Sequence, residues 1–215
     1  IRATKKVYGL PEDRSFFVPD RLGRIREECQ KRGETLESTW KSMYDEYKTA
    51  HPDLASQFED ALRGKLPKQW DKDIPTFSGE DEPQATRNSG GKVLNAFAHR
   101  FPSLIGGSGD LSPSTKTLMS HTGYFSRDRY DHKNIPWGVR ELGMCGATNG
   151  LALHGGLRPF ASTFFVFSDY ARPAMRLAAI MKLPVIYIMT HDSIGVGEDG
   201  PTHQPVEHLA AFRAM

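Results

Sequence analysis

The hydrophobic pattern in the first third of the chain is helical. Between residues 19 and 47 apolar side chains recur three and four positions apart, and Gly33 divides them into two groups that we expect to form two helices. Residues 52–64 repeat apolar side chains every four positions and predict another helix. Residues 65–82 contain prolines and glycines that interrupt any regular element, and they predict a linker.

From about residue 86 the pattern changes to strands that alternate with helices. Helices are predicted over residues 86–100, 142–154 and 168–181, and short strands over residues 103–107, 159–163 and 184–189. The run Pro184–Met189 is apolar throughout, which is typical of a parallel strand covered on both faces. The sequence therefore predicts an α/β fold, with a mostly parallel sheet and helices on both faces, preceded by a helical segment.

Three local signals refine this expectation. Trp137–Val139 is predicted to end a strand. Ser168 or Asp169 is expected to cap the helix over residues 168–181, with Pro173 in its first turn. After the glycine-rich loop at residues 195–200, Thr202 is expected to cap a further helix.

Composition narrows the class of protein. The 215 residues carry 28 Lys and Arg against 26 Asp and Glu, a balance that argues against the basic stripe of a nucleic-acid-binding protein. No apolar run approaches the ~18 residues that span a bilayer, so we expect a soluble chain without a membrane partner. Cys29 and Cys145 are too few and too far apart for a disulfide framework, which favours a cytoplasmic location.

Candidate chemistry gathers in the second half, which contains seven of the eight histidines. The loop after the last apolar strand, HDSIGVGEDGPTHQP at residues 191–205, lies where open α/β sheets place their ligands. On the residues alone, it could also be a tight turn whose polar groups satisfy loop amides and cap the next helix. A zinc site is disfavoured because His191 and His203 lack the close spacing of a zinc pair.

The same loop resembles the signature of the transketolase family. Three more segments resemble transketolases in the same order: GGSGDLSPS at residues 106–114, GVRELGM at 138–144 and STFFVFSDYAR at 162–172. The resemblance covers residues 87–215, and residues 1–86 fit more loosely. It implies that residues 1–80 are the helical C-terminal part of a diphosphate-binding domain with its linker. Residues 81–215 would then be a pyrimidine-binding domain that is incomplete at its C-terminus.

The resemblance implies an activity and its partners. Transketolases move a two-carbon ketol unit from a ketose phosphate to an aldose phosphate through the ylide of thiamine diphosphate. They are homodimers with active sites between subunits, and Mg²⁺ or Ca²⁺ holds the diphosphate. The glycine-rich metal motif of the family does not occur in these residues. We therefore expect the ion's ligands in another part of the protein, and the segment alone to be inactive.

The resemblance also assigns residues. Glu141 would bond nitrogen 1′ of the aminopyrimidine, and His203 would act beside the reacting carbonyl; both are the expected catalytic residues. Leu142, where the family usually has His, departs from the pattern. Besides Glu141, the residues expected to bind the cofactor are Asp110, Leu111, Phe164, Phe167 and Tyr170. The residues expected to bind the sugar phosphate, together with His203, are Arg87, Ser114, His191 and Asp199.

Each of these residues also has a purely structural interpretation. A glutamate at a helix N-terminus is often a surface residue, and aromatic residues three apart are often an ordinary core face. At the level of function, dihydroxyacetone synthase and deoxyxylulose-phosphate synthase are related thiamine-diphosphate enzymes. A non-catalytic dimerisation fragment is the alternative from a different class.

Overall fold

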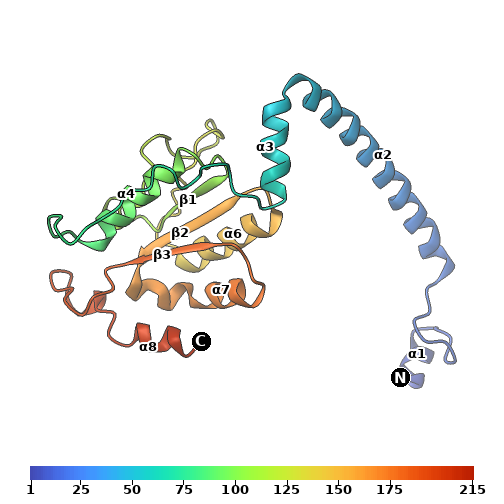
Figure 1. Cartoon of the computed structure of the whole chain (residues 1–215). Helices are drawn as coiled ribbons and strands as arrows, with labels where there is room; N and C mark the ends of the chain where they lie inside the picture. The colour runs from blue at the N-terminus through green and yellow to red at the C-terminus, as the bar shows by residue number, and fades with distance from the viewer. The chain divides into compact units, whose positions relative to one another are not determined.

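The computed structural model describes all 215 residues, which divide into two compact units, Ile1–Ser56 and Gln57–Met215. The first unit is helical and contains α1 (Arg2–Val7), α2 (Asp20–Ala50) and the start of α3 (Pro52–Leu62). The second unit contains the sheet and its covering helices (Figure 1). None of the helices is long and apolar enough to cross a membrane.

The expectation of two helices divided at Gly33 is wrong, because α2 is one helix of 31 residues. A glycine inside a helix costs only about 1 kcal/mol relative to alanine. Side-chain pairs one turn apart support the helix on both sides of Gly33, including Gln30 with Glu34 at 2.9 Å and Glu37 with Lys41 at 2.6 Å. The helix ends where Pro52 follows His51, since the residue before a proline disfavours helical backbone.

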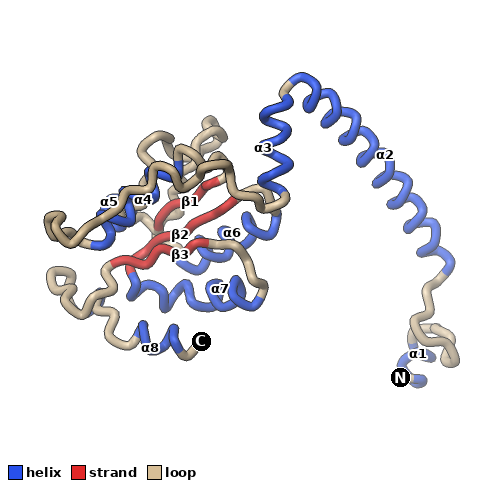
Figure 2. The backbone as a smooth tube through the Cα atoms, in the orientation of Figure 1, coloured by secondary structure: helices blue, strands red, loops and turns tan.

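The second unit is built on three parallel strands in the order β1-β2-β3. They are β1 (Leu104–Ser108), β2 (Arg158–Phe164) and β3 (Ile186–Thr190). In their register Gly106 lies opposite Phe160, which in turn lies opposite Ile186 (strands in red in Figure 2). Gly106 has to be a glycine, because a Cβ there would lie 2.2 Å from the carbonyl oxygen of Phe160.

Helices cover both faces of this sheet (Figure 1). On one face, α4 (Thr86–Ala98) packs through Leu94 and Ala98 against Leu104 and Phe160. On the other face, α6 (Glu141–His154) and α7 (Ser168–Ile180) share a core with Ala161. Phe160 and Ala161 are neighbours in β2, so they point to opposite faces, as pleated strands require. The predicted α/β fold with a parallel sheet covered on both faces is confirmed.

The segment around Trp137 is not a strand, contrary to the sequence prediction. Asn134 and Ile135 instead run beside β1, and the Ile135 N–H donates to the Gly106 carbonyl at 2.7 Å. The buried Asn134 amide donates to the Met119 carbonyl and accepts from the Met119 N–H, both at 2.9 Å. Side-chain hydrogen bonds, which hydrophobic periodicity does not register, therefore hold this segment.

Two predicted helix starts are also corrected. Neither Ser168 nor Asp169 caps α7 through its side chain, and Pro173 lies inside the helix rather than in its first turn. After the glycine-rich loop, Pro201–His203 forms only the short 3₁₀ turn η2. Helix α8 (His208–Arg213) begins later, since Pro205 has no N–H to continue a helix and restricts the residue before it.

Candidate active site

The three strands end at the same edge of the sheet, and the segments that follow them carry the predicted site residues. Ser108, Phe164 and Thr190 are the last residues of β1, β2 and β3. Their carboxyl ends are aligned by the register, which pairs Ser108 with Ser162 and Phe164 with Thr190. This edge is where parallel α/β sheets bind ligands.

Phe164, Phe167 and Tyr170 lie in succession where β2 passes into α7. Phe164 ends β2, Phe167 ends the 3₁₀ turn η1 (Phe165–Phe167), and Tyr170 lies in the first turn of α7. The Phe164 and Phe167 rings are nearly parallel, with centroids 6.0 Å apart, and Tyr170 is 6.4 Å from Phe167. Phe164 is buried, whereas Tyr170 is 64% exposed, so the row of rings leads from the core to the surface.

The loop after β3 folds back onto these rings. The His191 ring stacks on Phe164 with a centroid distance of 3.7 Å. His203, in η2, meets Phe167 edge-on at 5.2 Å and lies 6.1 Å from Phe164. Two imidazoles and two phenyl rings from β2, η1, η2 and the loop therefore form one wall, which we call the aromatic wall: Phe164, Phe167, His191 and His203.

Glu141 is the first residue of α6, and only 7% of it is exposed. It lies beside the loop after β1: a Cβ at Gly109 would be 3.7 Å from Glu141 Oε1. Burial, with a smaller contribution from Glu141, raises the pKa of the Cys145 thiol to about 12. Glu141 therefore places a carboxyl group beside the loop after β1, at the carboxyl edge of the sheet.

Asp110 and Leu111 occupy the tight loop between β1 and α5 (Ser112–Thr115). Asp110 has a φ of 66°, a left-handed conformation that aspartate tolerates better than most residues. The buried Ser108 hydroxyl accepts a hydrogen bond from the Leu111 N–H at 2.9 Å. This bond closes the turn that contains Gly109, the residue that lies beside Glu141.

Arg87 and His191 line a second part of the site, a pocket of about 670 Å³ between α4 and the end of β3. Burial and the positive charge of Arg87 lower the pKa of His191, and Asp199 and Asp192 partly oppose that shift. The His191 imidazole is therefore favoured in its neutral form, with a nitrogen available to bond a ligand. The loop brings Asp199 close enough to His191 for its negative charge to act on the pKa of the imidazole.

Of the residues expected to bind the sugar phosphate, Asp199 and His203 do not line this pocket, and neither does Ser114. Ser114 is exposed on α5, and its neighbour Thr115 lines the pocket instead. Ser193 also lines the pocket, and sequence reasoning missed it. Its signal was its place directly after His191 and Asp192 in the loop motif. Leu142, which departs from the family pattern, is 55% exposed on the first turn of α6.

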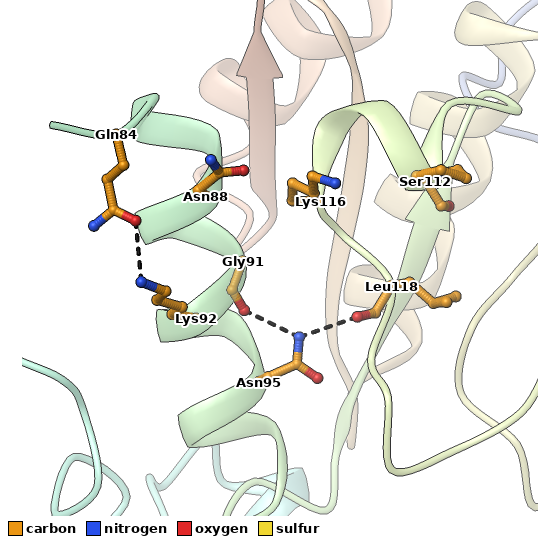
Figure 3. Close-up of a pocket in the computed structure, with 9 residues that line it drawn as sticks. Gln84, Asn88, Gly91, Lys92, Asn95, Ser112, Lys116 and Leu118 are labelled. Atoms are coloured by element: carbon orange, nitrogen blue, oxygen red, sulfur yellow. Dashed lines mark hydrogen bonds between the residues drawn. The ribbon is translucent and has the colours of Figure 1, made fainter. Parts of the chain in front are cut away.

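The other flank of α4 borders a separate pocket of about 640 Å³ (Figure 3). The Asn95 side-chain amide, which lines this pocket, donates to the carbonyl oxygens of Gly91 and Leu118, at 3.0 and 3.1 Å. Lys92 donates to the Gln84 side chain at 3.0 Å. None of the predicted site residues lines this pocket, so the candidate chemistry belongs to the carboxyl edge of the sheet.

One cluster of potential metal ligands lies between α7 and α8. Asp169, Glu207 and His208 have ligand atoms within 4.8 Å of one another. His208 is 2% exposed, whereas both carboxylates are exposed. This cluster joins α7 to α8 and is separate from Glu141.

Two domain families match the chain. Residues 82–215 match the pyrimidine-binding domain of transketolase, and residues 1–67 match its thiamine-diphosphate-binding domain. The transketolases of Halalkalibacterium halodurans and Bacillus subtilis are 51% and 48% identical over the whole chain. The chain spans 32% of the length of each of these relatives.

Solved transketolase structures have the same fold. The Pichia stipitis enzyme in complex with sedoheptulose 7-phosphate is 37% identical, with a TM-score of 0.91. The Leishmania mexicana enzyme is 39% identical, also with a TM-score of 0.91. Each comparison covers 100% of this chain and 32% of the solved chain. Together with the domain matches, they establish that the chain belongs to the transketolase family.

Proposed function

We propose that the protein containing this chain is a thiamine-diphosphate-dependent transketolase. It transfers a two-carbon ketol unit from a ketose phosphate to an aldose phosphate, and this chain contributes the side of the site that holds the aminopyrimidine. The observation that carries the proposal is the position of Glu141, which is 7% exposed in the first turn of α6 and lies beside the loop after β1 at the carboxyl edge of the sheet. The identity of about 50% to curated transketolases supports the reaction type.

We assign the domains as the sequence suggested, with residues 1–80 belonging to the diphosphate-binding domain and linker, and residues 81–215 to the pyrimidine-binding domain. The family matches to residues 1–67 and 82–215 support this division. The stretch between α3 and α4 contains no regular helix or strand, as a linker would.

The residues at this edge fit an aminopyrimidine ring. The ring is flat and aromatic, so the faces of Phe164 and Phe167 can pack against it, with Tyr170 at the exposed end of the row. Glu141 would hold a proton at ring nitrogen 1′, and Leu111 would support the cofactor from the loop after β1, with Asp110 beside it. When bound, thiamine diphosphate supplies the carbon nucleophile that carries the two-carbon unit.

The neighbouring pocket suits the phosphorylated end of the sugar. The Arg87 guanidinium can bond a phosphate with two donors, and the neutral imidazole of His191 adds another. Ser114 is exposed on α5 outside this pocket, and it remains a proposed ligand of the sugar phosphate. Asp199 would bond a sugar hydroxyl, and His203 would stabilise or move a proton at the reacting carbonyl oxygen.

The remaining parts of the assignment concern the whole enzyme. We propose a homodimer, a cytoplasmic location and a role in the pentose phosphate pathway, with Mg²⁺ or Ca²⁺ bound to the cofactor's diphosphate. The ion's ligands are expected outside these 215 residues, because the chain contains no GDG motif followed by an asparagine.

The isolated 215-residue chain should therefore bind thiamine diphosphate weakly and catalyse no transfer. It offers contacts to the aminopyrimidine but none of the expected ligands for the diphosphate and its metal ion, which contribute most of the charge-assisted bonds. Calorimetric titration of the isolated chain with cofactor and Mg²⁺ checks this. A dissociation constant in the micromolar range would contradict the assignment of the diphosphate ligands.

Asp199→Ala in the complete enzyme should narrow the discrimination between sugars that are epimers at carbon 2. The preferred epimer should lose about tenfold in kcat/KM, on the order of one hydrogen bond to a charged acceptor, whereas the other epimer should change little. Glu198→Ala is the matched control, because Glu198 is an exposed acid next to Asp199 in the same loop. An equal loss on both epimers, together with a lower melting temperature, would assign Asp199 to loop structure.

The proposed function is tested by incubating the complete enzyme with a ketose phosphate and a panel of acceptors, with and without thiamine diphosphate. We expect transfer to aldose phosphates that depends on the cofactor. Transfer only to formaldehyde would favour a dihydroxyacetone synthase, and the use of pyruvate as donor would favour a deoxyxylulose-phosphate synthase. Absence of any product with cofactor bound would favour a non-catalytic protein.

A further inference from the structure

The buried His208 in α8 has no role in the proposed reaction, yet it contacts the segment that carries the aromatic wall. Its Nε2 lies 3.1 Å from the Val166 carbonyl oxygen and 3.2 Å from Asp169 Oδ2. An imidazole nitrogen that faces two acceptors is an N–H donor. Its Nδ1 is buried without a hydrogen-bond partner, and the Glu207 carboxylate lies 3.9 Å away.

The two acceptors belong to consecutive elements of the site. Val166 is the central residue of η1, between Phe164 and Phe167, and Asp169 lies in the first turn of α7. A short 3₁₀ turn satisfies few of its own backbone groups, so an outside donor on the Val166 carbonyl fixes its geometry. One imidazole thus holds the bend from which the Phe167 ring projects.

Packing around His208 separates the two sides of η1. Phe165 turns towards α8, where its ring lies 5.6 Å from His208 and 5.7 Å from Phe212. The Arg172 guanidinium lies over the Phe212 ring at 5.5 Å. Phe164 and Phe167 instead contact the histidines of the aromatic wall. Within η1, Phe165 and the Val166 carbonyl therefore contact α8, whereas Phe167 contacts the aromatic wall.

The same anchor fixes His203. Only residues 204–207 separate η2, which ends at His203, from His208. Because His208 is fastened to Val166, this short connection limits how far His203 can move from the Phe167 ring, now 5.2 Å away. On the proposed function, Phe167 contacts the cofactor and His203 the substrate, so both depend on this one attachment.

We propose that His208 is a positioning residue, which fastens η1 to α8 and thereby holds Phe167 and His203 in register with each other. The proposal rests on the proposed function for the roles of those two residues. The attachment itself rests on the contacts of His208 with Val166 and Asp169.

The test compares His208→Leu, which keeps bulk but loses both ring nitrogens, with His208→Gln, whose amide keeps a donor, in the complete enzyme. His154→Leu, an exposed histidine at the end of α6, is the control. We expect His208→Leu to raise the Kd for thiamine diphosphate about tenfold and to lower kcat about tenfold, since the half-buried Val166 carbonyl loses its donor. The KM for the ketose phosphate should change less than about twofold.

All variants are measured well below their melting temperatures, so that a loss of stability alone leaves Kd and kcat unchanged. His208→Gln should recover both constants to within about threefold of wild type. Wild-type Kd and kcat in His208→Leu would overturn the proposal, as would equal losses in the Leu and Gln variants. If His208→Leu does not fold, Asp169→Ala removes the exposed acceptor and should raise the Kd about threefold; an unchanged Kd there would also overturn it.

Hydrogen exchange without cofactor separates this inference from the proposed function. Amides of residues 165–169 and of His203 should exchange faster in His208→Leu than in wild type, and at the wild-type rate in His154→Leu. A wild-type enzyme that does not bind the cofactor would refute the proposed function. The exchange rates would still decide whether His208 fixes the segment, because unchanged rates would overturn that claim.

Discussion

Glu141→Gln in the complete enzyme should lower kcat by about 10²–10⁴ at saturating thiamine diphosphate, the usual effect of removing a positioned acid–base group. Glutamine has the same shape, so the first turn of α6 and its contact with Gly109 should persist. On the proposed function, the carboxyl shares a transferable proton with ring nitrogen 1′, and an amide cannot hold that proton. The loss should therefore appear in the chemical step, with the fold intact.

Asp53→Asn is the matched control for this variant. Asp53 is also an acid in the first turn of a helix, but it is exposed at the start of α3. We expect the control to retain wild-type turnover and both proteins to keep wild-type melting temperatures within a few degrees. If Glu141→Gln keeps more than half of its turnover with cofactor saturating, Glu141 is an ordinary helix N-terminal residue and the catalytic assignment is wrong.

Arg87→Ala should raise the KM for phosphorylated sugars by roughly 10–150-fold, which corresponds to a lost charge-assisted bond of about 1.5–3 kcal/mol. Unphosphorylated sugars never make this bond, so their KM should change little. His191 should respond as well: the positive charge of Arg87 contributes to its lowered pKa, so its pKa should rise in the variant. Steady-state kinetics on a matched pair of sugars, with an NMR titration of His191, measures both effects.

Lys92→Ala controls for the loss of any cation from α4. Lys92 lies on the same helix but lines the other pocket, where it donates to Gln84 (Figure 3). We expect it to leave the ratio of KM values between the two sugars unchanged. Similar losses on both sugars in Arg87→Ala would show that Arg87 supports the structure of α4 rather than binding phosphate.

The sequence predicted the sheet well because its strands are short apolar runs between clear breaks. The predicted strand at residues 159–163 lies within β2, and the one at residues 184–189 covers all of β3 except its last residue. The predicted helix at residues 86–100 matches α4. The prediction failed where a glycine was tolerated inside a helix and where side-chain hydrogen bonds, rather than hydrophobic periodicity, determine the backbone. Gly33 did not break α2, and Asn134 organised the segment near Trp137 through its amide.

The candidate site was only partly accessible from sequence. The motifs placed Glu141, Phe164 and His203 in separate segments of the sequence. Only the folded edge of the sheet brings the rings of Phe164 and His203 together, with their centroids 6.1 Å apart. Thr115 and Ser193 were missed as pocket residues because a lining position depends on the tertiary arrangement. His208 was missed for the same reason, since nothing in its local sequence indicates the contact with Val166, which is distant along the chain.

The most direct test of the central claim is a crystal structure of the complete enzyme with thiamine diphosphate bound. We expect the aminopyrimidine ring to pack against Phe164 and Phe167, with ring nitrogen 1′ within hydrogen-bond distance of the Glu141 carboxyl. Electron density for the aminopyrimidine away from this edge of the sheet, with ring nitrogen 1′ out of reach of the Glu141 carboxyl, would contradict the account.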